Sequence, residues 1–137
     1  MHSLRQLLVN FGQILQGQLF PRLEAELGPL GERHEKLVRT LALLQLDGFV
    51  AVRHGRGRPS HDRAAIARAF VAKAVFNLPT TRALLSRLYS DLPLRRLCGW
   101  ERAAEIPDET VFSRAFAEFA ATQFPQQVHA ALGVVKK

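Results

Sequence analysis

Apolar residues recur at helical spacing along most of the chain. The first stripe falls at i, i+3, i+4, i+7, i+10, i+11 and i+15 over residues 4–19, which predicts one amphipathic helix with Ser3 as its N-cap. A second stripe predicts a helix over residues 32–46 that ends before Gly48. These two segments form a predicted N-terminal helical pair.

The same spacing continues after residue 61, where capping residues mark the helix starts. The predicted N-caps are Asp62, Thr80, Asp91 and Asp108. The predicted helices cover residues 62–77, 80–89, 92–97, 108–123 and 125–132. In the first of them, the residues expected to face inward are Ile66, Phe70, Val71, Ala74 and Val75. No segment has a strand pattern with an obvious partner, so we predict an all-α fold, a compact multi-helix domain.

Three of these helices have the lengths and close spacing of a helix-turn-helix unit, which makes the C-terminal half helix-turn-helix-like. The third, over residues 108–123, would be the recognition helix. Thr110, Ser113 and Arg114 in its first turns are suited to reading base edges. The alternative is a core helix whose exposed face binds nothing. Two glutamates that offset Arg114, and a long connection before this helix, keep that alternative open.

The positive charge is concentrated in the middle third of the chain. Residues 53–102 hold eleven Lys and Arg against three acids, a balance of +8 within a total of +7. Residues 1–52 balance to 0 and residues 103–137 to −1. A basic segment between neutral flanks indicates an anionic partner, and duplex DNA is the first candidate.

A short peptide in this segment, GRGRP over residues 55–59, resembles the core of an AT-hook. Arg56 and Arg58 around a glycine could lie in a narrow A·T-rich minor groove, with Arg53 close by. The alternative is a plain Gly/Pro hinge with solvated arginines. We treat residues 53–61 as a basic arm between two helical parts.

The arginines on the following helices form a second candidate set, for phosphate contacts. The set consists of Arg63, Arg82, Arg87, Arg95 and Arg96. The alternative is a solvated surface with i,i+4 salt bridges, and the scarcity of acids in this segment argues against it.

Other chemistry finds little support in the sequence. The five histidines have no metal-ligand spacing, and no triad, P-loop or dinucleotide fingerprint is present. The single cysteine, Cys98, excludes an intramolecular disulfide and reads as a buried small hydrophobe. No apolar run is long enough to span a membrane. We therefore expect no catalytic residue, no metal site, no cofactor, no membrane partner and a cytoplasmic, nucleoid-associated protein.

From about residue 19 to residue 132 the chain resembles the N-terminal domain of bacterial insertion-sequence transposases with a DDE catalytic core. Three stretches carry the resemblance, in fixed order: LFPRLEAELGPL, GRGRPSHDRAAIARAFVAKAVFNLPTTRALLSRLYSDLPLRRLCGW and IPDETVFSRAFAEFA. In that family an RNase H-like domain that follows this region carries the Asp, Asp, Glu triad. The resemblance implies a non-catalytic domain that recognises terminal inverted repeats, so none of the aspartates here is given a catalytic role.

These observations predict three parts. Residues 1–52 are a helical pair and a candidate homodimer element, residues 53–61 the basic arm, and residues 62–137 the DNA-binding domain. The predicted function is to bind element ends and assist assembly. The alternative is an oligomerisation scaffold without sequence-specific DNA recognition, because the leucine stripe over residues 4–19 has few charges.

Overall fold

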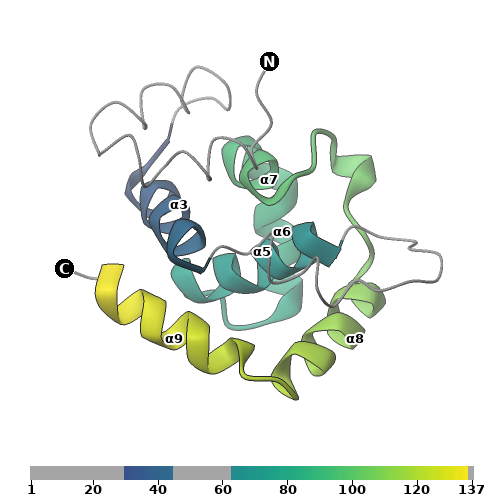
Figure 1. The fold of residues 1–137 in the computed structure, drawn as a ribbon. Coiled ribbons are helices and arrows are strands. Elements are labelled where there is room, and N and C mark those ends of the chain that lie inside the picture. The colour runs from purple at the N-terminus through teal and green to yellow at the C-terminus, as the bar shows by residue number, and fades with distance from the viewer. Residues whose placement is uncertain (1–29, 45–62, 136–137) are drawn as a thin grey trace.

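The computed structural model describes residues 30–44 and 63–135, and within these ranges every regular element is a helix (Figure 1). The elements are α3 (Glu32–Leu44), α5 (Arg63–Val75), α6 (Thr81–Ser90), α7 (Leu92–Cys98), a 3-10 turn η3 (Ala103–Glu105), α8 (Glu109–Ala120) and α9 (Phe124–Val135). The all-α prediction is confirmed. The stripe over residues 4–19, the arm over 53–61 and the Asp62 cap lie outside the described residues.

Three of the predicted helix starts are confirmed by hydrogen bonds. The Thr80 hydroxyl accepts from the Ala83 amide at 3.0 Å. The Asp91 and Asp108 carboxylates accept from the amides three residues later, at 3.0 and 3.2 Å. Each cap satisfies an amide that the first turn of a helix leaves without a backbone partner. Helices α6, α7 and α8 therefore begin directly after the capping residues predicted from the sequence.

Helix α5 lies at the centre of the fold and is buried on nearly all sides, between α3, α7, α6 and α8 (Figure 1). Its sequence, RAAIARAFVAKAV, supplies small alanines that let neighbouring helices approach closely. The prediction of a single inward face is wrong for this helix. Ala74 is exposed, whereas Ala65, Ala67 and even Arg68 are buried.

An aromatic cluster joins α5 to the two C-terminal helices. Phe70 stacks on Phe124 with ring centroids 5.2 Å apart, and it meets Phe116 and Phe119 edge to face at 5.2 and 5.5 Å. In these stacked and edge-to-face arrangements the ring quadrupoles attract one another, which adds to the stabilisation from burying apolar area. On α8, Phe112, Ala115 and Phe119 are buried against this core, while Ala120 is exposed.

Helix α3 belongs to the same core although 18 residues separate it from α5 in the sequence. It packs mainly against α9 and α5. Leu37, Val38 and Leu41 are buried and join the single hydrophobic cluster that holds residues of all the other helices. Helix α3 is therefore held in the fold by its packing against α5 and α9.

The helix-turn-helix reading of α6, α7 and α8 stays a prediction. Helix α8 packs mainly against α6, α9 and α5, and η3 interrupts its connection to α7. In the described part of the chain, no helix has the length and apolar character that a bilayer crossing needs.

Candidate nucleic-acid interface

Three arginines donate to the carbonyl oxygens at the ends of three helices. Arg33 reaches the Val75 carbonyl at the end of α5, at 3.3 Å. Arg68 reaches the Cys98 carbonyl at the end of α7, at 2.7 Å. Arg95 donates to the carbonyls of Leu88 and Tyr89 in the last turn of α6, both at 3.2 Å.

The last carbonyls of a helix lack backbone partners and carry partial negative charge, so a guanidinium is a fitting cap there. Arg95 belongs to the predicted phosphate-binding set, and Arg68 to the charge excess of residues 53–102. Part of that excess therefore serves the fold. Local sequence patterns do not predict this role, because the capped carbonyl lies 30 residues from Arg68 and 42 residues from Arg33.

Asp91 collects several donors at the corner between α6 and α7. Besides its own N-cap bond, its carboxylate accepts from Arg87 Nε at 2.9 Å and lies 2.9 Å from His34 Nε2. The other ring nitrogen of His34, Nδ1, accepts from the Gly31 amide at 2.8 Å, so Nε2 carries the proton donated to Asp91. This network ties α3 to the α6–α7 corner.

The environment of Asp91 lowers its pKa below the ordinary value. Burial by itself would raise the pKa, but the hydrogen bonds from the Leu94 amide, Arg87 and His34 together outweigh burial. The carboxylate is consequently charged at neutral pH. Arg87, which also lies over the Phe76 ring at 4.8 Å, is held in this network.

The expectation that scarce acids leave the arginines without partners is wrong. Arg87 forms the i,i+4 pair with Asp91, and Arg96 lies 3.2 Å from Glu101. Arg63 reaches Glu118 at 2.7 Å, and Arg82 reaches Glu109 at 3.4 Å. Two of these four pairs, Arg63–Glu118 and Arg82–Glu109, join different helices, so local sequence spacing did not reveal them.

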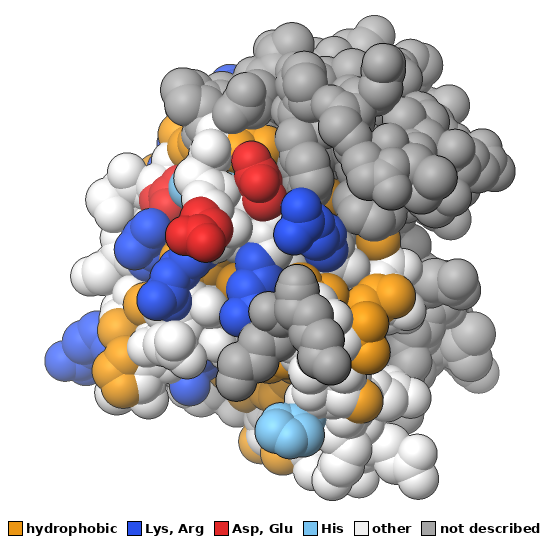
Figure 2. Space-filling model, turned by 90° about the vertical axis from the view of Figure 1, so that its left-hand side faces the viewer, with side chains coloured by type: hydrophobic (Ala, Val, Ile, Leu, Met, Phe, Trp, Pro, Cys, Tyr) orange, Lys and Arg blue, Asp and Glu red, His pale blue; other side chains and the backbone are white. Residues whose placement is uncertain are grey.

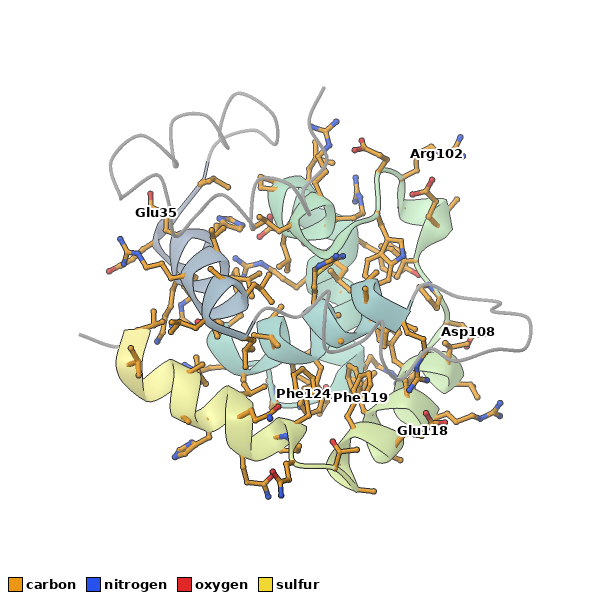
Figure 3. All side chains as sticks on the ribbon, viewed as in Figure 1. Glu35, Arg102, Asp108, Glu118, Phe119 and Phe124 are labelled. Carbon is orange, nitrogen blue, oxygen red and sulfur yellow. The ribbon has the colours of Figure 1, made fainter. Side chains whose placement is uncertain are left out.

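The structure brings Arg82 of α6 next to the first turn of α8, where the predicted base-reading residues lie. Thr110, Ser113 and Arg114 are exposed on α8. We call this surface the α6–α8 face, which consists of Arg82, Glu109, Thr110, Ser113, Arg114 and Glu118. Figure 3 shows Glu118 on α8 and Asp108, the N-cap of α8, on the outer side of the molecule.

The two acids on the α6–α8 face are each held by an arginine from another helix. Glu109 is held by Arg82, whose side chain is 83% exposed, and Glu118 by Arg63, which also lies over the Phe119 ring at 5.2 Å. Among the described residues, Arg114 is the base of this face that pairs with neither acid. The face therefore presents an available guanidinium beside two hydroxyl side chains.

The other arginines that were predicted to contact DNA do not belong to the α6–α8 face. Arg87, Arg95 and Arg96 lie around α7, away from the first turns of α8, and have the partners described above. Arg53, Arg56 and Arg58 lie outside the described residues. The structure thus groups Arg82 with the α8 residues and separates them from the α7 arginines.

Two hollows flank α9 on the other side of the molecule. One, of about 480 Å³, is lined by charged residues of both signs from α3, and Figure 2 shows blue and red side chains mixed on this face. The other, of about 490 Å³, is mainly apolar and lies between α5 and α9, with Lys73 and His129 in its lining. The first hollow has mixed charge and the second is mainly apolar, so neither is a strongly basic surface.

The described residues contain no group of three or more His, Cys, Asp or Glu side chains that could hold a metal ion. Cys98 is buried, and desolvation raises the pKa of its thiol to about 12. A thiol of this kind is protonated at neutral pH and is a poor nucleophile.

Comparison with known proteins gives one match. The family model described as Transposase domain (DUF772) matches residues 24–118, more than half of the chain. The curated proteins gave no match, and the solved structures gave none either. The matched range includes α3, α5, α6, α7 and most of α8.

Proposed function

Because the chain belongs to the transposase domain family (DUF772), we propose that it binds duplex DNA at the ends of a mobile element and helps to assemble the transposase there. The α6–α8 face is the proposed contact surface. A protein that binds DNA in this way would be associated with the nucleoid.

One observation carries the proposal: Arg114 is exposed and available on a face whose acids are both held by other arginines. An exposed arginine can contact a phosphate or form a bidentate pair with guanine, and threonine and serine hydroxyls can bond to base edges or phosphates. Arg82 at the rim would hold a neighbouring phosphate.

The basic arm is proposed to act on the same DNA. Arg58 precedes Arg63 by five residues, and a chain of that length spans at most about 18 Å. Arg53, Arg56 and Arg58 would then contact a minor groove beside the region that α8 approaches. Three further arginines would contribute phosphate contacts only through the donors that their internal partners leave available: Arg87, Arg95 and Arg96.

The test is selection from a random duplex library, followed by salt titration of binding to the enriched duplex and to a scrambled duplex. We expect preference for the enriched duplex and a linear loss of log affinity with log salt. Arg114→Ala should weaken binding about five- to tenfold, in line with the loss of a good arginine contact. Equal binding of both duplexes would contradict sequence-specific recognition.

Arg102→Ala is the matched control. The Arg102 side chain is also exposed, at 79%, and its removal changes the net charge by the same amount as removal of Arg114. Arg102 lies directly before η3, in the connection between α7 and α8 and away from the exposed row on α8 (Figure 3). We expect less than a twofold effect from it. An equal loss for both variants would show that net charge, and not the α6–α8 face, governs binding.

The proposal gives the chain a binding role and no strand-transfer activity of its own. Incubation with a labelled enriched duplex and Mg²⁺ or Mn²⁺ tests this. Intact DNA is the expected result, and specific cleavage would overturn it. The alternative of a scaffold rests on residues 4–19, which lie outside the described residues, and nothing in the described part favours it.

A further inference from the structure

We infer that Arg63 is a positioning residue for DNA recognition: by holding Glu118, it keeps Arg114 available for the nucleic acid. This inference rests on the DNA-binding function proposed above and assigns a role within that site. It differs from the expectation that Arg63 itself binds a phosphate.

The geometry of α8 makes Glu118 the natural partner of Arg114. Residues four apart on a helix lie on the same side, one turn from each other, close enough for an ion pair. Thr110, Arg114 and Glu118 therefore form one row along the exposed side of α8. Left to local interactions, Glu118 would neutralise Arg114 and place an acid beside the DNA.

Arg63 prevents this pairing. Its guanidinium bonds Glu118 at 2.7 Å across 55 residues of sequence and lies over the Phe119 ring at 5.2 Å. The side chain is only 29% exposed, against 50% for Glu118. A guanidinium ordered by an aromatic ring and partly shielded from water binds a carboxylate better than a solvated arginine does. Glu118 is thus engaged by α5, and Arg114 remains available.

Three variants test this inference by fluorescence anisotropy with a labelled mixed-sequence duplex, alongside the enriched duplex. Arg63→Ala should weaken binding about three- to fivefold, because it removes one positive charge and allows Glu118 to pair with Arg114. Adding Glu118→Gln to Arg63→Ala should restore affinity to within about twofold of the wild type. Glu118→Gln alone should strengthen binding by up to about twofold, because it removes a negative charge from the α6–α8 face.

The matched control is Arg63→Ala with Glu35→Gln. It has the same net charge as the rescuing pair, but Glu35 lies on α3, on the opposite side of the molecule from Glu118 (Figure 3). We expect no rescue from it. Rescue by both pairs would mean that total charge alone sets affinity, and this would overturn the inference.

The other outcomes are also decisive. If Arg63→Ala loses affinity and Glu118→Gln does not restore it, Arg63 contacts DNA directly and the inference is wrong. A crystal structure of Arg63→Ala gives a readout independent of DNA: Glu118 within 4 Å of Arg114 supports the inference, and Glu118 turned away from Arg114 overturns it. Absence of DNA binding by the wild type would instead remove the proposed function, whatever this crystal structure shows.

Discussion

At the residue scale, a single glycine and a single arginine explain the end of α7. Gly99 has φ of +121°, a conformation that side chains rarely adopt, and its amide donates to the carbonyls of Arg95 and Arg96. A Cβ added there would lie 3.0 Å from the buried Arg68 guanidinium, which itself holds the Cys98 carbonyl. The sequence predicted that this helix ends near residue 97, but the close approach of Arg68 comes from α5.

Gly99→Ala should therefore destabilise the fold by about 1–3 kcal/mol through backbone strain and displacement of Arg68. Gly133→Ala is the control, because Gly133 lies in α9 with nothing within 4 Å of an added Cβ. That change should be neutral or stabilising by up to about 1 kcal/mol. Urea denaturation followed by circular dichroism measures both, and equal stabilities of the two variants would contradict this account.

Cys98 provides a second prediction at this scale. With its thiol buried and its pKa raised to about 12, Cys98 should not react with a thiol reagent at pH 8 until the protein unfolds. Because the folded state keeps the thiol protonated above the unfolded pKa, stability should fall as the pH rises from about 9 towards 12. Rapid labelling of Cys98 without denaturant would show that α7 opens readily.

At the element scale, capping decides where the short helices begin and end. Aspartates and a threonine cap α6, α7 and α8 at their N-termini, and arginines cap α5, α6 and α7 at their C-termini. Helices of 7 to 13 residues have a large share of unpaired end groups, so such caps matter more than in long helices. Two of the seven bases in residues 63–98, Arg68 and Arg95, are used in this way.

Asp91 is the N-cap with the most partners. Substitution by alanine and by asparagine distinguishes the contribution of its charge from that of its capping hydrogen bond. Asp91→Ala should cost about 2–3 kcal/mol, because the Leu94 amide, Arg87 and His34 all lose their acceptor. Asp91→Asn retains a capping oxygen and should cost about 1 kcal/mol less. Equal losses in chemical denaturation would show that the charge matters more than the cap.

The pH dependence of stability follows from the lowered pKa of Asp91. A depressed pKa in the folded state means that the stabilisation is present above the unfolded pKa near 3.8 and is lost as the pH falls through the lower folded value. The difference in stability between wild type and Asp91→Asn should be constant from pH 7 to about 5 and shrink below about 4. A constant difference down to pH 2.5 would contradict the role of the carboxylate.

At the scale of the whole molecule, one hydrophobic cluster unites α3 with the helices that follow residue 62. We therefore expect one cooperative unfolding transition for all described helices. Leu41→Ala, at a position 1% exposed, should cost about 2–5 kcal/mol and shift that transition without splitting it. Leu43→Ala on the same helix, at 52% exposure, should cost less than about 1 kcal/mol. A separate early transition for α3 in hydrogen exchange would contradict this prediction.

Apolar periodicity and capping residues predicted the described helices and the caps at Thr80, Asp91 and Asp108, because both signals act within four residues along the chain. The sequence also indicated a transposase domain, and the family match agrees with that prediction. Tertiary packing buries α5 on nearly all sides and sets which arginines face inward. It also brings Arg82 beside Glu109 and engages Glu118 with Arg63, which leaves Arg114 available, and these two pairs join residues 27 and 55 positions apart. Such partners depend on how whole helices pack, and no local pattern in the sequence encodes them.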